Sequence, residues 1–188
     1  MAEFPTHTHE TAPEAAKPII EQVQAKYGFL PNLLATMATA PALLEAYATL
    51  GGIFAKTDLA ETERQVILMT NNVLNGCTYC MAAHTTISKM AKVDDTVIEA
   101  LRNDTPIPDA KLEALRTFAR VVNVSRGWPS DADIEAFLAA GYTEQTVLEV
   151  VLGTAFKTLS NYTNHIASTE VDAAFAPNAW SAPEKSAA

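Results

Sequence analysis

The sequence has few cysteines, no basic cluster and no long apolar run, and each absence argues against a class of protein. Only two of the 188 residues are cysteine, which is too few for a secreted disulfide scaffold. No stretch approaches the roughly 18 consecutive apolar residues that a membrane-spanning helix needs. Lys and Arg number 13 against 22 Asp and Glu, a net charge of −9. This balance argues against nucleic acid and against an anionic membrane surface as partners.

What is present favours one globular domain. Apolar residues make up 48% of the chain, enough to fill a core and to exclude disorder as the main state. We expect a flexible polar tail over residues 1–12, a single domain over 13–176 and a second tail over 177–188. The N-terminus has neither the basic start nor the apolar run of a signal peptide, so we expect a cytoplasmic protein.

The periodicity of apolar residues predicts an all-α fold. Apolar side chains recur at helical spacing along most of the chain, and no convincing strand alternation interrupts them. Proline, capping residues and the Asn75-Gly76 pair mark the expected helix ends. The expected helices cover about 13–27, a short stretch after Pro31, Pro41 to about 57, 59–74 behind an Asp58 cap, 77–90, 94–103, 112–125, 130–138 and a last long helix from Thr143.

One cluster of residues carries recognisable chemistry. Cys77, Cys80 and His84 stand at positions i, i+3 and i+7, so they share one face of a helix. The preceding Asn-Gly break places the cysteines in the first turn, where free N–H groups and the helix dipole stabilise a thiolate. His84 lies one turn beyond Cys80 and can contact its sulfur.

Two chemistries fit this cluster, and both stay open at this point. A thiolate can attack a peroxide oxygen, with His84 taking the thiol proton and the second cysteine closing a disulfide. Alternatively, Cys77, Cys80 and His84 are three ligands of a zinc ion, with His165 or water as the fourth. The plain alternative is a pair of buried thiols beside a core histidine.

The segment LAETERQVILMTNNVLNGCTYCMAAH, residues 59–84, resembles the core motif of the carboxymuconolactone decarboxylase / alkylhydroperoxidase D (AhpD)-like family. That motif is a Glu, eleven residues, Cys-x-x-Cys, three residues and His. The wider frame, from KYGFLPNLLATMA to Asn164-His165, resembles its long peroxidase-related branch. The resemblance implies an all-helical homo-oligomer (dimer, trimer or hexamer) with thiol peroxidase or disulfide reductase activity. It also implies that Cys80 attacks the peroxide, Cys77 resolves and His84 relays the proton.

The sequence departs from the motif at one important position. Gln65 stands where the family has its glutamate, and an amide cannot accept and release a proton as a carboxylate does. Gln65 could orient His84 by a hydrogen bond, leaving the imidazole to work alone, or Glu61 or Glu63 could substitute. We favour a solvated first helical turn for both glutamates, and we therefore expect slow turnover.

Three further residues are candidates for supporting roles. Tyr79, between the cysteines, could donate a hydrogen bond to the thiolate or substrate, or could simply pack. Asn161 and His165 are four residues apart on the last helix, and with Asn164 they could approach the cysteines or join helices in an oligomer interface.

The expected partners follow from this chemistry. We expect a hydroperoxide or a small disulfide as substrate, and an external dithiol or redox protein as reductant. No phosphate-binding glycine loop is present, so neither flavin nor nicotinamide is expected as a cofactor. The alternatives are a non-redox, decarboxylase-like enzyme of the same fold, which the intact cysteine pair argues against, and a zinc-binding or redox-sensing oligomer.

Overall fold

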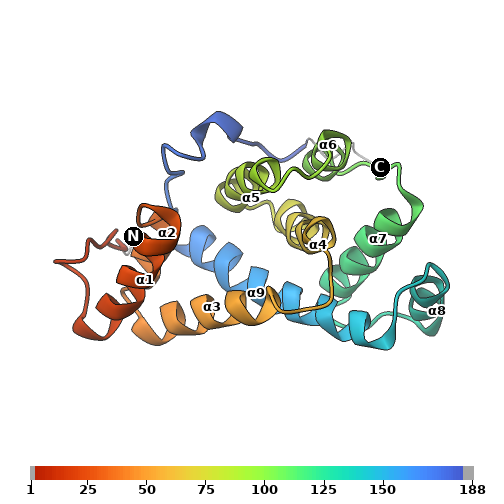
Figure 1. Cartoon of the computed structure of the whole chain (residues 1–188), viewed down its shortest axis with the longest axis horizontal. Coiled ribbons are helices and arrows are strands. Elements are labelled where there is room, and N and C mark those ends of the chain that lie inside the picture. Colours follow the sequence, from red (N-terminus) through yellow and green to blue (C-terminus); the bar gives the residue numbers. More distant parts are fainter. Residues whose placement is uncertain (1–2, 184–188) are drawn as a thin grey trace.

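The computed structural model describes residues 3–183, and these residues form α-helices and short 3-10 turns without any strand (Figure 1). The all-α prediction is therefore confirmed. The elements are η1 (Glu14–Ala16), α1 (Lys17–Tyr27), α2 (Asn32–Met37), α3 (Pro41–Phe54), α4 (Glu61–Leu74), α5 (Thr78–Met90), α6 (Asp95–Asn103), α7 (Ala110–Val124), α8 (Asp131–Ala139), α9 (Glu144–Ala167) and η2 (Ala176–Asn178).

Helix α4 is the centre of the fold. It packs against α5, α6, α7 and α9, and lies in the middle of the molecule in Figure 1. Its apolar residues Val66, Ile67 and Met69 are completely buried. Burying large aliphatic side chains on every side contributes about 1.5–3 kcal/mol each, so α4 is held firmly in place. That position matters because α4 also carries buried polar residues toward the predicted site.

The helix starts follow local capping chemistry. The side chains of Ser130 and Thr143 cap α8 and α9. The predicted Asp58 cap of α4 is wrong: the helix begins at Glu61, and the Glu63 carboxylate accepts the Ala60 N–H at 2.8 Å. Asp58 instead accepts a hydrogen bond from the Gln145 side chain at 2.9 Å.

The two predicted tails contact the domain within the described residues. Near the N-terminus, Ala12 is buried, and the His7 N–H donates to the Ala35 carbonyl at 3.4 Å. Near the C-terminus, the Trp180 indole N–H donates to the Arg102 carbonyl at 2.8 Å, and Lys89 donates to Asn178 at 2.8 Å. These contacts fix this part of the chain onto α5 and α6, and the predicted domain bounds stay a prediction. Residues 184–188 of the predicted tail lie outside the described part.

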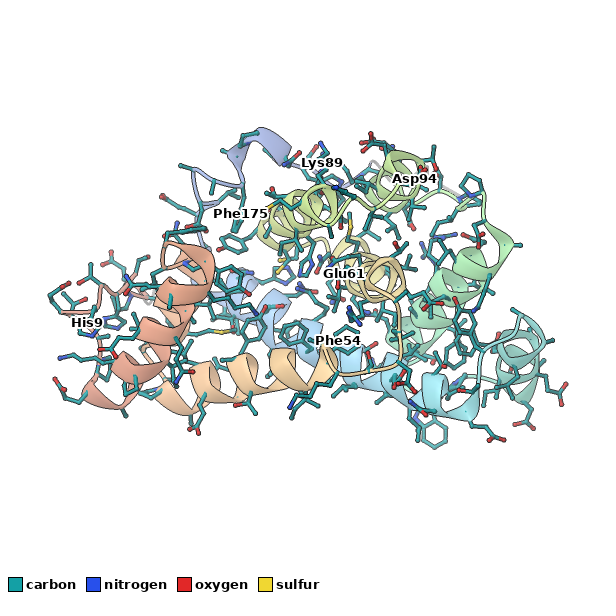
Figure 2. The ribbon with its side chains drawn as sticks, in the orientation of Figure 1. His9, Phe54, Glu61, Lys89, Asp94 and Phe175 are labelled. Atoms are coloured by element: carbon teal, nitrogen blue, oxygen red, sulfur yellow. The ribbon has the colours of Figure 1, made fainter. Side chains whose placement is uncertain are left out.

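A second apolar cluster lies over the start of α5. It joins Ile20, Leu34 and Met37 from the N-terminal helices to both cysteines. Phe175, from the segment after α9, lies between these helices and α5 (Figure 2). The N-terminal helices therefore form the cover of the cysteine pair, and water has little access to either sulfur.

The outward side of α9 is apolar over much of its length. Leu148, Val151, Tyr162 and Ile166 are 69%, 48%, 55% and 70% exposed. Their spacing places them along one face of the helix. Homo-oligomerisation stays a prediction, and this face is the part of the described surface that agrees with it. No helix among residues 3–183 is long and apolar enough to cross a membrane.

Candidate active site

The two cysteines sit at the junction between α4 and α5. Gly76 adopts a positive φ of 66°, which glycine tolerates without steric cost, and this turn redirects the chain. Cys77 is the N-cap of α5 and Cys80 lies in its first turn. Both thiols are free and almost completely buried, with exposed fractions of 0% and 2%.

One side-chain amide group contacts both sulfur atoms. The Asn164 Nδ2 group on α9 lies 3.1 Å from Cys80 Sγ and 3.7 Å from Cys77 Sγ. Its own Oδ1 is buried without a hydrogen-bond partner among the described residues. A donor shared by two sulfurs favours negative charge on them, so Asn164 is placed to stabilise a thiolate.

Further asparagines fix α9 against the cysteine-bearing turn. The Asn161 amide donates to Asn72 Oδ1 at 3.0 Å and accepts from Asn75 at 2.8 Å. Asn72 in turn donates to the backbone carbonyl of Cys80 at 3.2 Å. The predicted supporting residue Asn161 is therefore brought to the site, where it positions the backbone around Cys80 as well as lying near its sulfur.

The pKa values of the two thiols are shifted in opposite directions. Burial acts to raise the pKa of Cys80, but the Cys77 thiol donates a hydrogen bond to it and Lys157 lies nearby, and the net result is a lowered pKa. The pKa of Cys77 is raised, first because it donates to Cys80 and second because it is buried. Of the two sulfurs, Cys80 therefore favours the thiolate form and Cys77 keeps its proton more tightly, since two close sulfurs do not both ionise readily.

His84 lies in a chain of hydrogen bonds. Its Nδ1 is 2.9 Å from Gln65 Oε1, and its Nε2 is 3.1 Å from Lys157 Nζ. Gln65 donates its own NH₂ group to Glu61 Oε1 at 2.7 Å. Because the Glu61 carboxylate only accepts, the Gln65 oxygen must face His84, and His84 therefore donates through Nδ1–H. Its Nε2 then carries the lone pair that accepts from Lys157.

The sequence-based role of His84 is modified by this geometry. The imidazole was expected to lie against the Cys80 sulfur, but its two nitrogens are occupied by Gln65 and Lys157. Burial, followed by the positive charge of Lys157, holds the pKa of His84 well below its usual range. His84 is therefore a neutral histidine that orients the lysine.

Lys157 is the site residue that the sequence analysis missed. It lies on α9 and its exposed fraction is 0%. The sequence offers one signal for Lys157. It is the one Lys or Arg of α9, and it lies on the helix face that continues through the uncharged polar residues Ser160, Asn161 and Asn164. A lone lysine on such a face is compatible with a surface position, so only the packing of α9 against α5 identifies it.

The possible substitutes for the missing glutamate have different positions. Glu63 caps α4 and lies near Lys111, away from His84. Glu61, at the first position of α4 (Figure 2), reaches the site only through the Gln65 amide and also pairs with Arg64 at 2.8 Å. The expectation that Glu61 is merely solvated is incomplete, because it fixes the orientation of Gln65.

Tyr79 and His165 do not reach the sulfurs through hydrogen bonds. The Tyr79 hydroxyl donates to Asp172 Oδ2 at 2.5 Å and accepts the Leu33 N–H at 3.3 Å, so the packing interpretation of this residue is correct. His165 is exposed and lies over the Tyr162 ring, with 6.5 Å between centroids. Within the chain His165 does not approach the cysteines, because Asn164 and Lys157 occupy the inward face of α9. Its role in an oligomer interface stays a prediction.

The three predicted zinc ligands do not converge as a ligand set. His84 turns both nitrogens toward Gln65 and Lys157. Among residues 3–183, no group of three His, Cys, Asp or Glu side chains is arranged to hold a metal ion. Placing an ammonium group beside the histidine also opposes binding of a divalent cation.

A cavity of about 330 Å³ approaches this cluster from the side of α3. His84 and Gln65 contribute to its lining, and neither cysteine does. Tyr47 and Phe156 stack in its wall with ring centroids 4.6 Å apart. Burial, and then the nearby charge of Cys80, raises the pKa of Tyr47. The cavity therefore reaches the histidine that lies on the same helix as Cys80.

The neutral state of His84 predicts acid destabilisation. In the unfolded chain this histidine takes a proton below about pH 6.5, whereas in the folded chain its pKa is far lower. As pH falls below about 6.5, the unfolded state binds one more proton at His84 than the folded state does. The free energy of unfolding therefore falls by about 1.4 kcal/mol per pH unit because of this histidine. Denaturant titrations between pH 4 and 7 give the free energy of unfolding at each pH. This free energy should depend less steeply on pH in His84→Gln than in the wild type. The exposed control His165→Gln should keep the wild-type slope; equal slopes in all three proteins would contradict the assignment.

Known proteins share part of this sequence and its all-α fold. Residues 41–123 match the Carboxymuconolactone decarboxylase family. An uncharacterised peroxidase-related protein with an alkylhydroperoxidase AhpD core, from Ralstonia eutropha JMP134, is 25% identical, with a TM-score of 0.82 over 92% of this chain and 93% of that chain.

Two further solved structures share the fold at lower identity. A peroxidase-related protein from Silicibacter sp. TM1040 is 21% identical, with a TM-score of 0.79 over 93% of this chain and 92% of that one. The debrominase Bmp8, as its C82A variant in complex with 2,3,4-tribromopyrrole, is 20% identical, with a TM-score of 0.78 over 95% of this chain and 96% of that one. No curated protein matches the sequence.

Proposed function

Because residues 41–123 match the Carboxymuconolactone decarboxylase family, we propose that the protein is a cytoplasmic, thiol-dependent hydroperoxide reductase with Cys80 as the nucleophile. One observation carries the proposal. The Cys80 sulfur accepts from the Asn164 amide at 3.1 Å beside a second free thiol, and its pKa is lowered despite burial. Thiolates rather than thiols are the nucleophiles in sulfur chemistry.

The reaction proceeds in two steps at the sulfurs. The Cys80 thiolate attacks the terminal oxygen of ROOH, an S–O bond forms, the O–O bond breaks, and RO⁻ leaves to be protonated. Sulfur loses two electrons and the peroxide gains them. The Cys77 thiol then attacks the sulfenic sulfur, forming the disulfide and expelling water after proton transfer.

An external dithiol completes the cycle. It reduces the Cys77–Cys80 disulfide through a mixed disulfide and leaves as a disulfide itself. The same exchange would let the protein act as a disulfide oxidoreductase on a small disulfide. The reductant is a partner that we propose by chemistry alone, either a small dithiol or a redox protein.

The aromatic cavity favours a second candidate, reductive dehalogenation. Its wall stacks Tyr47 on Phe156 and it ends at His84, which suits a flat ring. In this reaction the thiolate takes the halogen from a ring carbon, the carbon gains a proton, and Cys77 displaces halide to form the same disulfide. The debrominase Bmp8 shares this fold, so bromide release from a bromopyrrole is the corresponding assay. A non-redox decarboxylase activity stays a prediction without support from the site.

A free-thiol count tests the peroxidase proposal. One equivalent of an organic hydroperoxide should lower the count from the two free cysteines to none, without covalent dimers. Cys80→Ser should lose peroxide consumption completely. Cys77→Ser is the matched control, because its Cys80 should still react once and stop as a sulfenic acid that a dimedone probe traps. Unchanged consumption by Cys80→Ser would overturn the assignment.

A further inference from the structure

Lys157 is a buried cation without a carboxylate partner. Its exposed fraction is 0%, and none of the Asp and Glu side chains among residues 3–183 forms an ion pair with it. Burying an isolated ammonium group is costly, and proteins normally pair such a group with an anion or a metal site. A negative charge near this side chain would offset that cost.

Few groups near Lys157 could carry the negative charge that balances it. Its one polar side-chain contact, His84 Nε2 at 3.1 Å, is neutral in the tautomer that Gln65 and Glu61 fix. The next residues on the same face of α9 are Ser160, Asn161 and Asn164, which are uncharged and lead to the sulfurs.

The other titratable groups near the sulfurs do not provide the missing anion. Tyr47 on α3 and Cys77 on α5 both hold their protons more tightly than usual. Glu61 on α4 lies behind the Gln65 amide, and Asp172 is occupied by the Tyr79 hydroxyl and the N–H of Asn32. Cys80 is the remaining group that can carry the charge.

We propose that Lys157 is the counter-ion of the Cys80 thiolate, and that it supplies the proton that a relay through Gln65 cannot move. The inference deepens the proposed function, because it assigns a positioning residue to the same site. It also gives the charge on the sulfur a cause within the fold: α9 supplies the cation, while α5 supplies the thiol and the histidine that orients the ammonium group.

The ion pair also accounts for the proton in the first step. Cys80–S⁻, ROOH and Lys157–NH₃⁺ become Cys80–SOH, ROH and Lys157–NH₂, so the alkoxide gains the proton that the ammonium group loses. The buried site is neutral before and after the step, and no unpaired charge remains. When the external dithiol regenerates the thiolate, Lys157 takes a proton back.

Replacing Lys157 by methionine tests this pairing. The rate of Cys80 alkylation by iodoacetamide is measured from pH 4 to 10, with mass spectrometry to identify the modified cysteine. In Lys157→Met the midpoint should rise by at least about one pH unit, which lowers the rate at the wild-type midpoint about five-fold or more. Lys157→Arg keeps a permanent charge and should keep most of the wild-type shift.

Controls separate charge from packing and from the proposed activity. Lys56→Met removes a lysine from an exposed position and should leave the midpoint unchanged. Apolar replacement of a buried charge is often tolerated, and Lys157→Gln provides a second neutral variant should methionine not fold. A wild-type midpoint near that of an ordinary cysteine, about 8.5, or an unchanged midpoint in a folded neutral variant, would overturn the pairing. Because no peroxide is used, the result does not depend on peroxidase activity.

Discussion

Replacing Gly153 by valine should destabilise the protein by about 3 kcal/mol or more, since overpacking of a core costs typically 1–3 kcal/mol for small insertions. Gly153 lies on α9, where an added Cβ would come within 2.7 Å of Ile67 Cγ2 and 3.0 Å of two Phe54 ring atoms. Both neighbours are buried, with exposed fractions of 0% and 2%, so neither can move into solvent. A valine adds two further methyl groups to a contact that alanine already overfills.

The substitution should also disturb the chemistry, because Gly153 is one turn from Lys157 on the same helix. Close contact of α9 with α4 brings the lysine to His84 and Asn164 to the sulfurs. Denaturant unfolding measures the stability loss, and the pH profile of Cys80 alkylation measures the displacement of the cation. We expect both to change in Gly153→Val.

Gly52→Ala is the matched control. Gly52 is also helical, in α3, but a Cβ there would meet nothing within 4 Å. Alanine should therefore stabilise the helix by about 0.5–1 kcal/mol through its better helix propensity. If Gly153→Ala were as stable as the wild type, the close packing of α9 on α4 would be contradicted, and with it the placement of Lys157.

The parts of the site that were predictable are those that depend on local spacing. Cys77, Cys80 and His84 lie on one short helix, so a helical period suffices to group them. The hydrogen bond between Gln65 and His84 was one of two alternatives for this position, and the structure has this contact at 2.9 Å. All of these residues lie on α4 and α5, so the register of these two neighbouring helices determines their positions.

The remainder depends on packing between segments far apart in the chain. Lys157 and Asn164 enter the site only because α9 crosses the α4–α5 hairpin, and no local pattern marks a single lysine as buried. His165 was expected in the site instead of Lys157, since spacing alone does not tell which face of α9 points inward. The position of Trp180 likewise depends on its hydrogen bond to the carbonyl of Arg102, which lies 78 residues earlier in the chain.

Restoring the carboxylate should accelerate the proposed peroxidase. In Gln65→Glu, a carboxylate would replace the amide oxygen that now lies 2.9 Å from His84 Nδ1. A negative charge at that distance raises the pKa of the imidazole, which is now held low by burial and by Lys157. A histidine that titrates nearer neutrality can transfer protons during turnover, and such general acid–base catalysis contributes roughly 10²–10⁴-fold.

Glu61 limits the gain from the single substitution. Its carboxylate now accepts from the Gln65 amide at 2.7 Å, and it would face a second carboxylate in Gln65→Glu. Two adjacent carboxylates do not both ionise readily, so one would keep a proton. In the double variant Gln65→Glu/Glu61→Gln the amide and the carboxylate exchange places, and the new glutamate keeps a donor behind it. We expect roughly ten-fold faster hydroperoxide consumption in the double variant and a smaller gain in Gln65→Glu.

The measurement is hydroperoxide consumption against pH, with a fixed excess of dithiol, for the wild type, both single variants and the double variant. Glu61→Gln alone should change the rate little, because it leaves no carboxylate beside His84. The rate gain should be largest at the pH where the histidine carries part of a proton. A folded double variant within two-fold of the wild type at every pH would show that proton transfer through His84 does not limit turnover. The Lys157–Cys80 pair would then suffice to form the thiolate and to protonate the leaving alkoxide, without proton transfer through His84.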